Sequence, residues 1–334
     1  MNFTGGVISQ QQKVKIKNLL PEIGISQMRE EIIQGLTAEP KSISSKYFYD
    51  KTGSELFNQI TQLPEYYPTR TEKNILHQIA PELMNRNSSF EIIELGSGDC
   101  SKISILLDAI DEQRLKNIYY VPVDVSKSAI ENSARELYER YSDLQINGYV
   151  ADFMHQLNLI PRKTQKRIIC FFGSTIGNFS AADAELIIKN LADELEGDDS
   201  LLIGFDLVKP RHLLHAAYND AAGITHAFNK NILNVVNQII ESDFQPDDFD
   251  SHSFFNEDKL RNEMHLVANK NCTVCSPFLK EQLRLKKGDS FHTESSHKYS
   301  VSAIEKLIEH THLAIQNIFT DSNQWFALVE FSKA

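Results

Sequence analysis

Two glycines separated by one residue follow a short apolar run in the sequence EIIELGSGDC. Gly96 and Gly98 therefore lie in a turn where the backbone can come close to a ligand, because glycine has no side chain to hold the ligand away. The dinucleotide fingerprint G-x-G-x-x-G needs a third glycine, and Ser101 stands at that position. A G-x-G turn also fits an ordinary connection between a strand and a helix, so other residues must decide.

Carboxylates stand at the ends of the next two apolar runs. Asp124 ends the strand in IYYVPVDVS, and Asp152 with Phe153 ends INGYVADF. At the carboxyl ends of parallel strands, Asp124 can accept hydrogen bonds from both hydroxyls of a ribose, Asp152 can bind an adenine amino group, and Phe153 can cover the ring. An aspartate at a strand end is also a common helix cap. Together with the glycine turn, these residues favour S-adenosylmethionine (SAM), which has no phosphate and needs only the close approach.

The elements around these residues alternate between short apolar strands and helical patterns, which indicates βαβ units and a parallel sheet. The expected strands are FEIIEL, IYYVPVDVS, INGYVADF, RIICFFGS and DSLLIGFDLV. The expected helices between them cover residues 101–110, 127–141 and 181–195. We therefore expect an α/β fold of the Rossmann-like class I SAM-dependent methyltransferase type.

The alternation stops after Lys209 and returns near residue 300. Before the first strand, helices are expected at 28–36, 54–62 and 71–86, the last with a threonine at its start. After Lys209, the expected elements are helices 212–222 and 229–240, antiparallel strands in SHSFFN, RNEMHLVANKNCTVC and EQLRLKKG, helix 302–310, and strands in AIQNIFTD and WFALVEFS. These patterns predict a SAM-binding domain of residues 71–208 and 299–334, and an α+β substrate-binding domain of residues 18–70 and 209–298.

The composition excludes several classes of protein. The 334 residues carry a net charge of −11, whereas a nucleic-acid-binding surface needs a basic stripe. The absence of any run of roughly 18 apolar residues and of an apolar signal core before Leu20 predicts a cytoplasmic protein without a membrane span. Four cysteines do not make a disulfide framework in so long a chain. We interpret Cys272 and Cys275 as two thiols on opposite faces of one strand, and we expect no metal site.

Several less common stretches carry a resemblance. They are LPEYYPTRTE, FFGSTIGNF, AYNDAAGITHAFNKNIL, RNEMHL and FHTESSHKYS. In order and spacing they resemble the histidine-specific Nα-methyltransferase family, whose members use SAM to convert L-histidine to hercynine in ergothioneine biosynthesis. The resemblance runs from about Ser44 to Phe331. Two departures are His292, where members usually have a basic residue, and the first 40 residues, which match no part of the family.

The resemblance implies a set of binding residues and a small-molecule substrate, L-histidine. The implied cofactor residues are Gly96, Lys102, Asp124, Asp152 and Phe153. The implied contacts to the substrate carboxylate are Asn178 and Tyr218, and those to the imidazole are Tyr66, Glu294 and Ser296. Further pocket positions fall on Tyr49, Gly173 and Met264. The family performs successive methyl transfers, and a small residue such as Gly173 near the amine is consistent with this.

The residue types suit such a substrate without reference to the family. An amide NH₂ and a phenol hydroxyl can donate two hydrogen bonds to a carboxylate, and a carboxylate with a nearby hydroxyl can bind an imidazole. Glu294 and Ser296 share one face if they lie on a strand, because side chains repeat every two residues. No residue is identified as a general base, since positioning of the reactants can lower the barrier by roughly 7–11 kcal/mol.

Three other functions remain open at this stage. A methyltransferase of the same architecture can act on another amino acid, such as a tryptophan derivative, and Glu294 with Ser296 counts against this. A protein of this fold can bind partners without catalysis, and an NAD-dependent oxidoreductase is the third alternative. The missing third glycine at Ser101 counts against the oxidoreductase.

Overall fold

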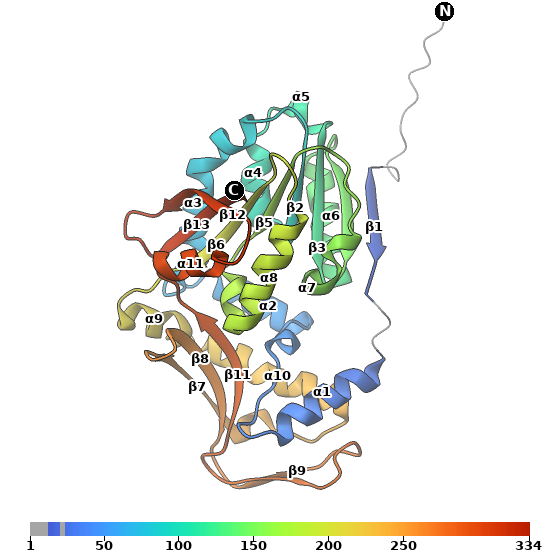
Figure 1. Ribbon diagram of the computed structural model, residues 1–334. Helices are drawn as coiled ribbons and strands as arrows, with labels where there is room; N and C mark the ends of the chain where they lie inside the picture. The colour runs from blue at the N-terminus through green and yellow to red at the C-terminus, as the bar shows by residue number, and fades with distance from the viewer. Residues whose placement is uncertain (1–12, 21–23) are drawn as a thin grey trace, which may run out of the picture.

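An eight-stranded sheet forms the centre of the computed structural model, which describes residues 13–20 and 24–334 (Figure 1). The strand order is β1-β4-β3-β2-β5-β6-β13-β12, in which β13 runs antiparallel to both of its neighbours, β6 and β12, and the other neighbouring strands pair in parallel. The strands are β1 (Val14–Asn18), β2 (Phe90–Leu95), β3 (Ile118–Asp124), β4 (Gln145–Val150), β5 (Arg167–Phe171), β6 (Ser200–Asp206), β12 (Leu313–Thr320) and β13 (Phe326–Lys333). This mostly parallel sheet confirms the predicted α/β fold.

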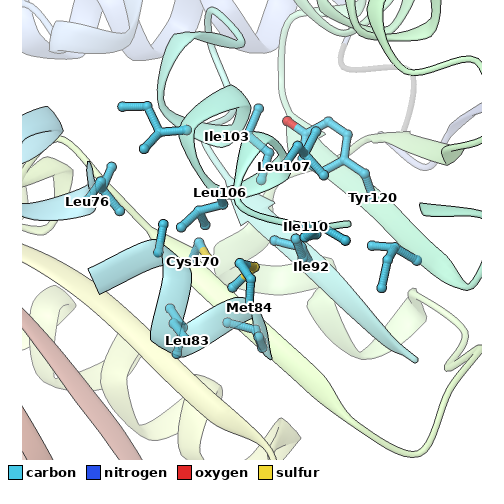
Figure 2. Close-up of a cluster of buried hydrophobic side chains, with 14 of the residues drawn as sticks. Leu76, Leu83, Met84, Ile92, Ile103, Leu106, Leu107, Ile110, Tyr120 and Cys170 are labelled. Atoms are coloured by element: carbon cyan, nitrogen blue, oxygen red, sulfur yellow. The ribbon is translucent and has the colours of Figure 1, made fainter. Parts of the chain in front are cut away.

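Helices cover both faces of this sheet, and every residue of its inner strands β2, β5 and β6 is buried. The covering helices are α3 (Tyr67–Asn85), α4 (Ser101–Asp108), α5 (Glu112–Leu115) and α6 (Lys127–Arg140), with α7 (Phe153–Gln156), α8 (Ala181–Glu194) and α11 (Val301–Ile308). Figure 2 shows one core, in which Leu76 and Leu83 of α3 and Leu106 of α4 pack with Ile92 and Cys170 of the sheet. A second core on the other face contains side chains of α8 and α11.

A smaller lobe lies beyond the carboxyl ends of the parallel strands (Figure 1). Its three-stranded antiparallel sheet has the order β11-β8-β7 and packs on α10, while β9 and β10 form a separate two-stranded ribbon. Its elements are α1 (Ile25–Thr37), α2 (Lys51–Ile60), α9 (Arg211–Tyr218), α10 (Ile224–Ile240), β7 (Phe249–Asn256), β8 (Arg261–Ala268), β9 (Cys272–Val274), β10 (Leu283–Leu285) and β11 (Ser290–His297). One apolar core joins the N-terminal helices to this insertion. That core supports the two-domain division, which we retain as a proposal.

The N-terminal strand β1 was not predicted. Its sequence VKIKN pairs in parallel with β4 at the edge of the main sheet, from Val14 opposite Ile146 to Asn18 opposite Val150. Val14 and Ile16 pack against the core and alternate with lysines. This two-residue alternation is typical of an edge strand with one buried face. The segment before residue 18 therefore belongs to the large sheet, and its lysines obscured the apolar alternation.

Helices α1, α2, α3 and α10 all begin earlier than predicted, and three of these starts have a local reason. Helix α3 begins at Tyr67 and not at Thr71, and Pro68 fits its first turn because the amide there needs no partner. Helix α2 begins at Lys51, because the Asp50 carboxylate caps it by accepting a hydrogen bond from the Gly53 amide at 2.7 Å. Helix α10 begins at Ile224 and not at Asn229, since the Asp220 carboxylate accepts from the amides of residues 224 and 225.

The segment RNEMHLVANKNCTVC forms two strands, β8 and β9, with a turn between them. Cys272 lies in β9, whereas Cys275 lies beyond the end of this strand and is exposed, so the two thiols do not share a strand as predicted. No helix in the described part of the chain has the length and apolar character of a membrane span.

Candidate active site

The glycine turn between β2 and α4 is shaped for close approach. Gly96 and Gly98 have φ of +63° and +47°, which are left-handed conformations that favour glycine. A Cβ at Gly96 would meet nothing within 4 Å, so the space beside its backbone is open. Asp124 at the end of β3 accepts the Gly98 amide at 3.2 Å and the Ser126 amide at 2.8 Å. Each carboxylate oxygen keeps a further acceptor position, so this arrangement fits a ribose.

Asp152 and Phe153 follow β4, next to Asp124 in the sheet. The Asp152 carboxylate caps the short helix α7 by accepting the Met154 amide at 2.9 Å, which is the alternative role considered for it. The ring of Phe153 packs edge-on against Phe171, with centroids 5.2 Å apart. The structure therefore brings both residues to the carboxyl edge of the sheet that also holds the glycine turn.

Glu72 is a site residue that the sequence analysis missed. Its side chain is fully buried on α3, and its carboxylate pairs with the Lys102 ammonium at 2.8 Å. It also accepts the Gly173 amide at 2.8 Å, so it links the helix after the glycine turn to the loop after β5. A Cβ at Gly173 would lie 3.0 Å from the Lys102 Nζ. The signal was present in the sequence, because Glu72 shares an apolar helical face with Ile75 and Ile79.

The loop after β5 touches strand β11 through backbone atoms. A Cβ at Gly177 would lie 2.8 Å from the carbonyl oxygen of His297 and 3.3 Å from its nitrogen. Asn178, the next residue, ends a short 3₁₀ helix (Thr175–Asn178) and is half-buried. Gly177 therefore allows the loop that carries Asn178 to approach the strand that carries Glu294 and Ser296.

Gly177→Ala is expected to lower the free energy of unfolding by about 1–3 kcal/mol, because the new methyl group meets backbone atoms that cannot rotate away. Urea denaturation measures this. Gly24→Ala is the matched control, since its Cβ would meet only the Ser26 hydroxyl at 3.2 Å. Equal stability of Gly177→Ala and the wild type would contradict the close contact.

A β-bulge in β11 aims Glu294 at the interior. Phe291 pairs with Leu266 and His292 with His265, but Glu294 pairs with Met264, so Thr293 is an extra residue in β11. Regular alternation would have placed Glu294 on the face of His292. The bulge instead turns Glu294, and Ser296 two residues later, to the face of Met264.

The Thr293 hydroxyl fixes this bulge. It donates to the Asn229 side-chain oxygen at 2.7 Å or to the Met264 carbonyl at 3.0 Å, both within the buried face of the lobe. The prediction that Glu294 and Ser296 share one face is confirmed, and they share it with Met264.

Three tyrosines lie near enough to the Glu294 carboxylate for its charge to affect them. Burial and then the nearby Tyr218, Tyr49 and Glu294 hold the pKa of Tyr66 well above its usual value. The Tyr49 pKa is likewise raised, first by desolvation and then by Glu294, Tyr218 and Asp124. Tyr49, which is 44% exposed, is therefore near both a predicted substrate residue and a predicted cofactor residue. The structure thus gathers these side chains in one region, although they are far apart in the sequence.

Burial raises the pKa of Glu294 to about 7, and the Lys298 ammonium opposes this shift. The other groups that face this carboxyl are the phenols of Tyr49, Tyr66 and Tyr218. No side chain in residues 13–20 or 24–334 donates a hydrogen bond to the Glu294 carboxylate. The group is thus a strong acceptor only when it is ionised, and ionisation is costly without a donor.

Glu294→Gln is expected to stabilise the folded protein at pH 8. Between its ordinary pKa of 4.5 and about 7, Glu294 keeps a proton in the folded state that it has released in the unfolded state. Stability therefore falls as pH rises through this window, and the cost, up to about 3 kcal/mol, is complete above pH 7. Urea denaturation should show the variant more stable at pH 8 and equal near pH 4.5. A wild type that is at least as stable at pH 8 would contradict the buried carboxylate.

Lys298 is a second residue that the sequence analysis missed. Its ammonium is fully buried and lies 3.1 Å from the Tyr218 hydroxyl, 2.7 Å from the Ser296 hydroxyl and 2.9 Å from the Asp206 carboxylate. It therefore joins a predicted carboxylate contact to a predicted imidazole contact. The sequence spacing could have indicated Lys298, because it continues the two-residue repeat of Glu294 and Ser296.

A cavity of about 520 Å³ lies beside this region, a volume typical of small-molecule sites. Asn178 and Glu294 both line it, together with residues of α1 and of the segment 42–45. The N-terminal helix α1 therefore forms one wall, which agrees with its packing in the core of the smaller lobe.

A group of ionisable side chains lies on the other face of the small sheet. Ligand atoms of Glu263, His265 and His292 lie within 4.8 Å of one another, a spacing that a metal ion could bridge. However, the Arg261 guanidinium lies 2.8 Å from the Glu263 carboxylate and neutralises it, and His265 Nε2 lies 3.1 Å from the same carboxylate. We interpret the group as a structural ion-pair network.

Known proteins resemble this chain over most of its length. The family described as histidine-specific methyltransferase, SAM-dependent, matches residues 28–333. A histidine N-alpha-methyltransferase of Mycolicibacterium smegmatis is 40% identical over 272 residues, which cover 81% of this chain and 84% of the relative.

More distant relatives extend the comparison. An ergothioneine biosynthesis protein 1 of Neurospora crassa is 31% identical over 275 residues, 80% of this chain and 30% of that longer protein. A 4-dimethylallyltryptophan N-methyltransferase of Claviceps purpurea is 25% identical over 302 residues, 83% of this chain and 87% of the relative.

These matches agree with the sheet order, the open glycine turn and the carboxylate at the end of β3. The predicted resemblance and the predicted use of SAM are confirmed. The chain belongs to the family of SAM-dependent, histidine-specific methyltransferases.

Proposed function

We propose that the protein transfers methyl groups from SAM to the α-amino group of L-histidine, in up to three successive steps that end at hercynine. The observation that carries the choice of substrate is the half-buried carboxylate of Glu294, which lines the cavity and shares a strand face with the Ser296 hydroxyl and Met264. A carboxylate acceptor beside a hydroxyl suits an imidazole, which offers one N–H and one lone pair in its neutral form.

The cofactor site is proposed at the carboxyl edge of the sheet. Gly96 gives the backbone access, Asp124 would accept the ribose hydroxyls, and Asp152 with Phe153 would hold the adenine. Lys102 and its partner Glu72 lie between this edge and Gly173. When bound, SAM supplies an electrophilic methyl group on a sulfonium.

The substrate site is proposed in the adjoining region between the loop after β5, α9 and β11. The Asn178 amide and the Tyr218 hydroxyl would donate to the substrate carboxylate, while Glu294 and Ser296 would bind the ring. Tyr49, Tyr66 and Met264 would enclose the substrate. This agrees with the effect of the Glu294 charge, which raises the pKa of both Tyr49 and Tyr66. Gly173 would leave room beside the amine for the methyl groups it gains.

The residues act by positioning. The α-ammonium must lose its proton before its nitrogen can attack, and we propose that this proton leaves to water as the amine enters the site. Two anchors on the carboxylate and two on the ring would then hold the nitrogen in line with the methyl group. Well-oriented reactants can lower a barrier by roughly 7–11 kcal/mol, which makes a dedicated base unnecessary for the proposed chemistry.

A tryptophan derivative is the alternative substrate, because the Claviceps relative is a 4-dimethylallyltryptophan N-methyltransferase. An indole offers one N–H and no ring acceptor, so the Ser296 hydroxyl would lose its partner, and a buried unpaired hydroxyl is unfavourable. The presence of both Glu294 and Ser296 on one strand face therefore favours histidine as the substrate.

Mass spectrometry of L-histidine incubated with the protein and SAM tests the proposal. The expected products carry one, two and three added methyl groups, and fragmentation should place all of them on the α-nitrogen. Methyl groups on the ring, or no product from histidine, would contradict it.

A further inference from the structure

The side chain of Lys298 lies at the junction of the two proposed substrate subsites. It follows β11 directly, and its exposed fraction is 3%. Its three donors point to three acceptors: the Tyr218 hydroxyl at 3.1 Å, the Ser296 hydroxyl at 2.7 Å and the Asp206 carboxylate at 2.9 Å. Tyr218 comes from α9, Ser296 from β11 and Asp206 from β6, so one ammonium ties three elements together.

The charge of Lys298 is secured by its surroundings. Although burial lowers the pKa of Lys298, the Asp206 carboxylate and Tyr218 raise it above its usual value. Asp206 in turn pairs with Lys209 and accepts the Tyr67 hydroxyl at 2.8 Å. Burial lowers the pKa of Lys209 to about 8, and the Asp206 carboxylate opposes this shift. Lys298 therefore carries its charge beside a carboxylate that it shares with Lys209.

An ammonium donates hydrogen bonds and accepts none. The Tyr218 and Ser296 oxygens must therefore accept from Lys298, and each hydroxyl keeps its own proton for another partner. The positive charge behind both oxygens favours orientations in which these protons point away from Lys298. We infer that Lys298 is a positioning residue, which orients the Tyr218 and Ser296 hydroxyls so that both donate hydrogen bonds to L-histidine. This inference rests on the proposed function.

This orientation selects one form of the substrate. The Tyr218 proton meets the anionic carboxylate, and the Ser296 proton meets the unprotonated nitrogen of a neutral imidazole, while Glu294 accepts the N–H of the other nitrogen. An imidazolium has no free lone pair for Ser296, and its charge would be repelled by the ammonium behind that hydroxyl. The site is therefore expected to bind the form of histidine that has a neutral imidazole ring and a free carboxylate.

The test compares Lys298→Met with Lys209→Met. Each variant removes one ammonium from the same carboxylate and leaves Asp206 with one buried lysine, so the charge change is matched. Only Lys298 contacts Tyr218 and Ser296. The substrates are L-histidine and L-histidinol, which lacks the carboxylate, and the affinity for SAM is measured by calorimetry.

Lys298→Met is expected to raise the KM for histidine about tenfold or more and to shrink the preference for histidine over histidinol by a similar factor. The affinity for SAM should stay within about twofold, because Lys298 lies outside the proposed cofactor contacts. Lys209→Met should keep the wild-type preference. A general loss of stability would affect the two substrates alike. The ratio of activity on histidine to activity on histidinol therefore distinguishes a positioning role from a purely structural one.

Two results would overturn the role of Lys298: an unchanged preference in Lys298→Met, or an equal loss in Lys209→Met. If Lys298→Met lacks a cooperative unfolding transition, Lys298→Gln and Lys209→Gln replace the pair, with the same expected ratios. A wild type that methylates neither substrate would contradict the proposed function and this role with it. An active wild type with an unchanged Lys298 variant would contradict the role alone.

Discussion

Replacing Glu294 with alanine is expected to raise the KM for L-histidine by about 10- to 100-fold, the effect of losing a hydrogen bond to a buried charged group. The carboxylate is turned inward by the bulge at Thr293 and has no donor in the described chain other than the one a substrate would bring. Steady-state kinetics at saturating SAM measures the change. The affinity for SAM should remain within about twofold, because Glu294 lies on the small sheet and not at the glycine turn.

The same variant should lose most of its preference for histidine over an apolar amino acid of similar size. A site that hydrogen-bonds a substrate rejects analogues strongly, because they leave its polar groups unpaired, and removing the polar group removes the penalty. Glu281→Ala, at an exposed glutamate of the same lobe, is the matched control and should behave as the wild type. A Glu294→Ala enzyme with the wild-type preference would show that the carboxylate does not read the ring.

Asp124→Ala is expected to weaken SAM binding by about tenfold or more, because the ribose hydroxyls lose a buried acceptor worth roughly 1–3 kcal/mol. The variant also loses the hydrogen bond that the carboxylate accepts from Gly98, so the glycine turn is held less firmly. Burial raises the pKa of Asp124, although the hydrogen bonds from the Ser126 and Gly98 amides lower it. Further donors, such as ribose hydroxyls, would therefore stabilise the ionised carboxylate. Calorimetry with SAM measures the affinity.

Asp198→Ala controls for the loss of a carboxylate from the sheet, since Asp198 is exposed at the opposite end of a parallel strand, before β6. Its affinity for SAM should equal that of the wild type. Asp124→Asn keeps one oxygen acceptor and should fall between the two. If a folded Asp124→Ala protein binds SAM as the wild type does, the ribose assignment is wrong.

The central fold followed from the sequence because its signals are local. The runs FEIIEL and RIICFF are mostly apolar without alternation, and a buried strand of a covered parallel sheet combines such runs with intervening helices. Strand β1 was missed because its alternation is short and its lysines dominate the composition. The start of α10 depends on Asp220, whose capping role requires the turn before the helix to be known.

In the proposed substrate site, the sequence predicted the relative orientation of side chains only where they follow the two-residue repeat of a strand. Glu294 and Ser296 were placed on one face by the two-residue repeat, but the face itself depends on the bulge at Thr293, which is held by Asn229 of another element. Glu72 and Lys298 acquire their roles from partners far away in the sequence, Gly173 and Tyr218, so pattern alone could not assign them.

The most direct test of the central claim is a competition between L-histidine and L-tryptophan at equal concentrations, with SAM and the wild-type protein, followed by mass spectrometry at early times. The ratio of the two products gives the ratio of the kcat/KM values. If Glu294 and Ser296 read an imidazole, methylated histidine should exceed methylated tryptophan by at least about 100-fold. Equal amounts of the two products, or an excess of methylated tryptophan, would contradict the claim that this site is built for histidine.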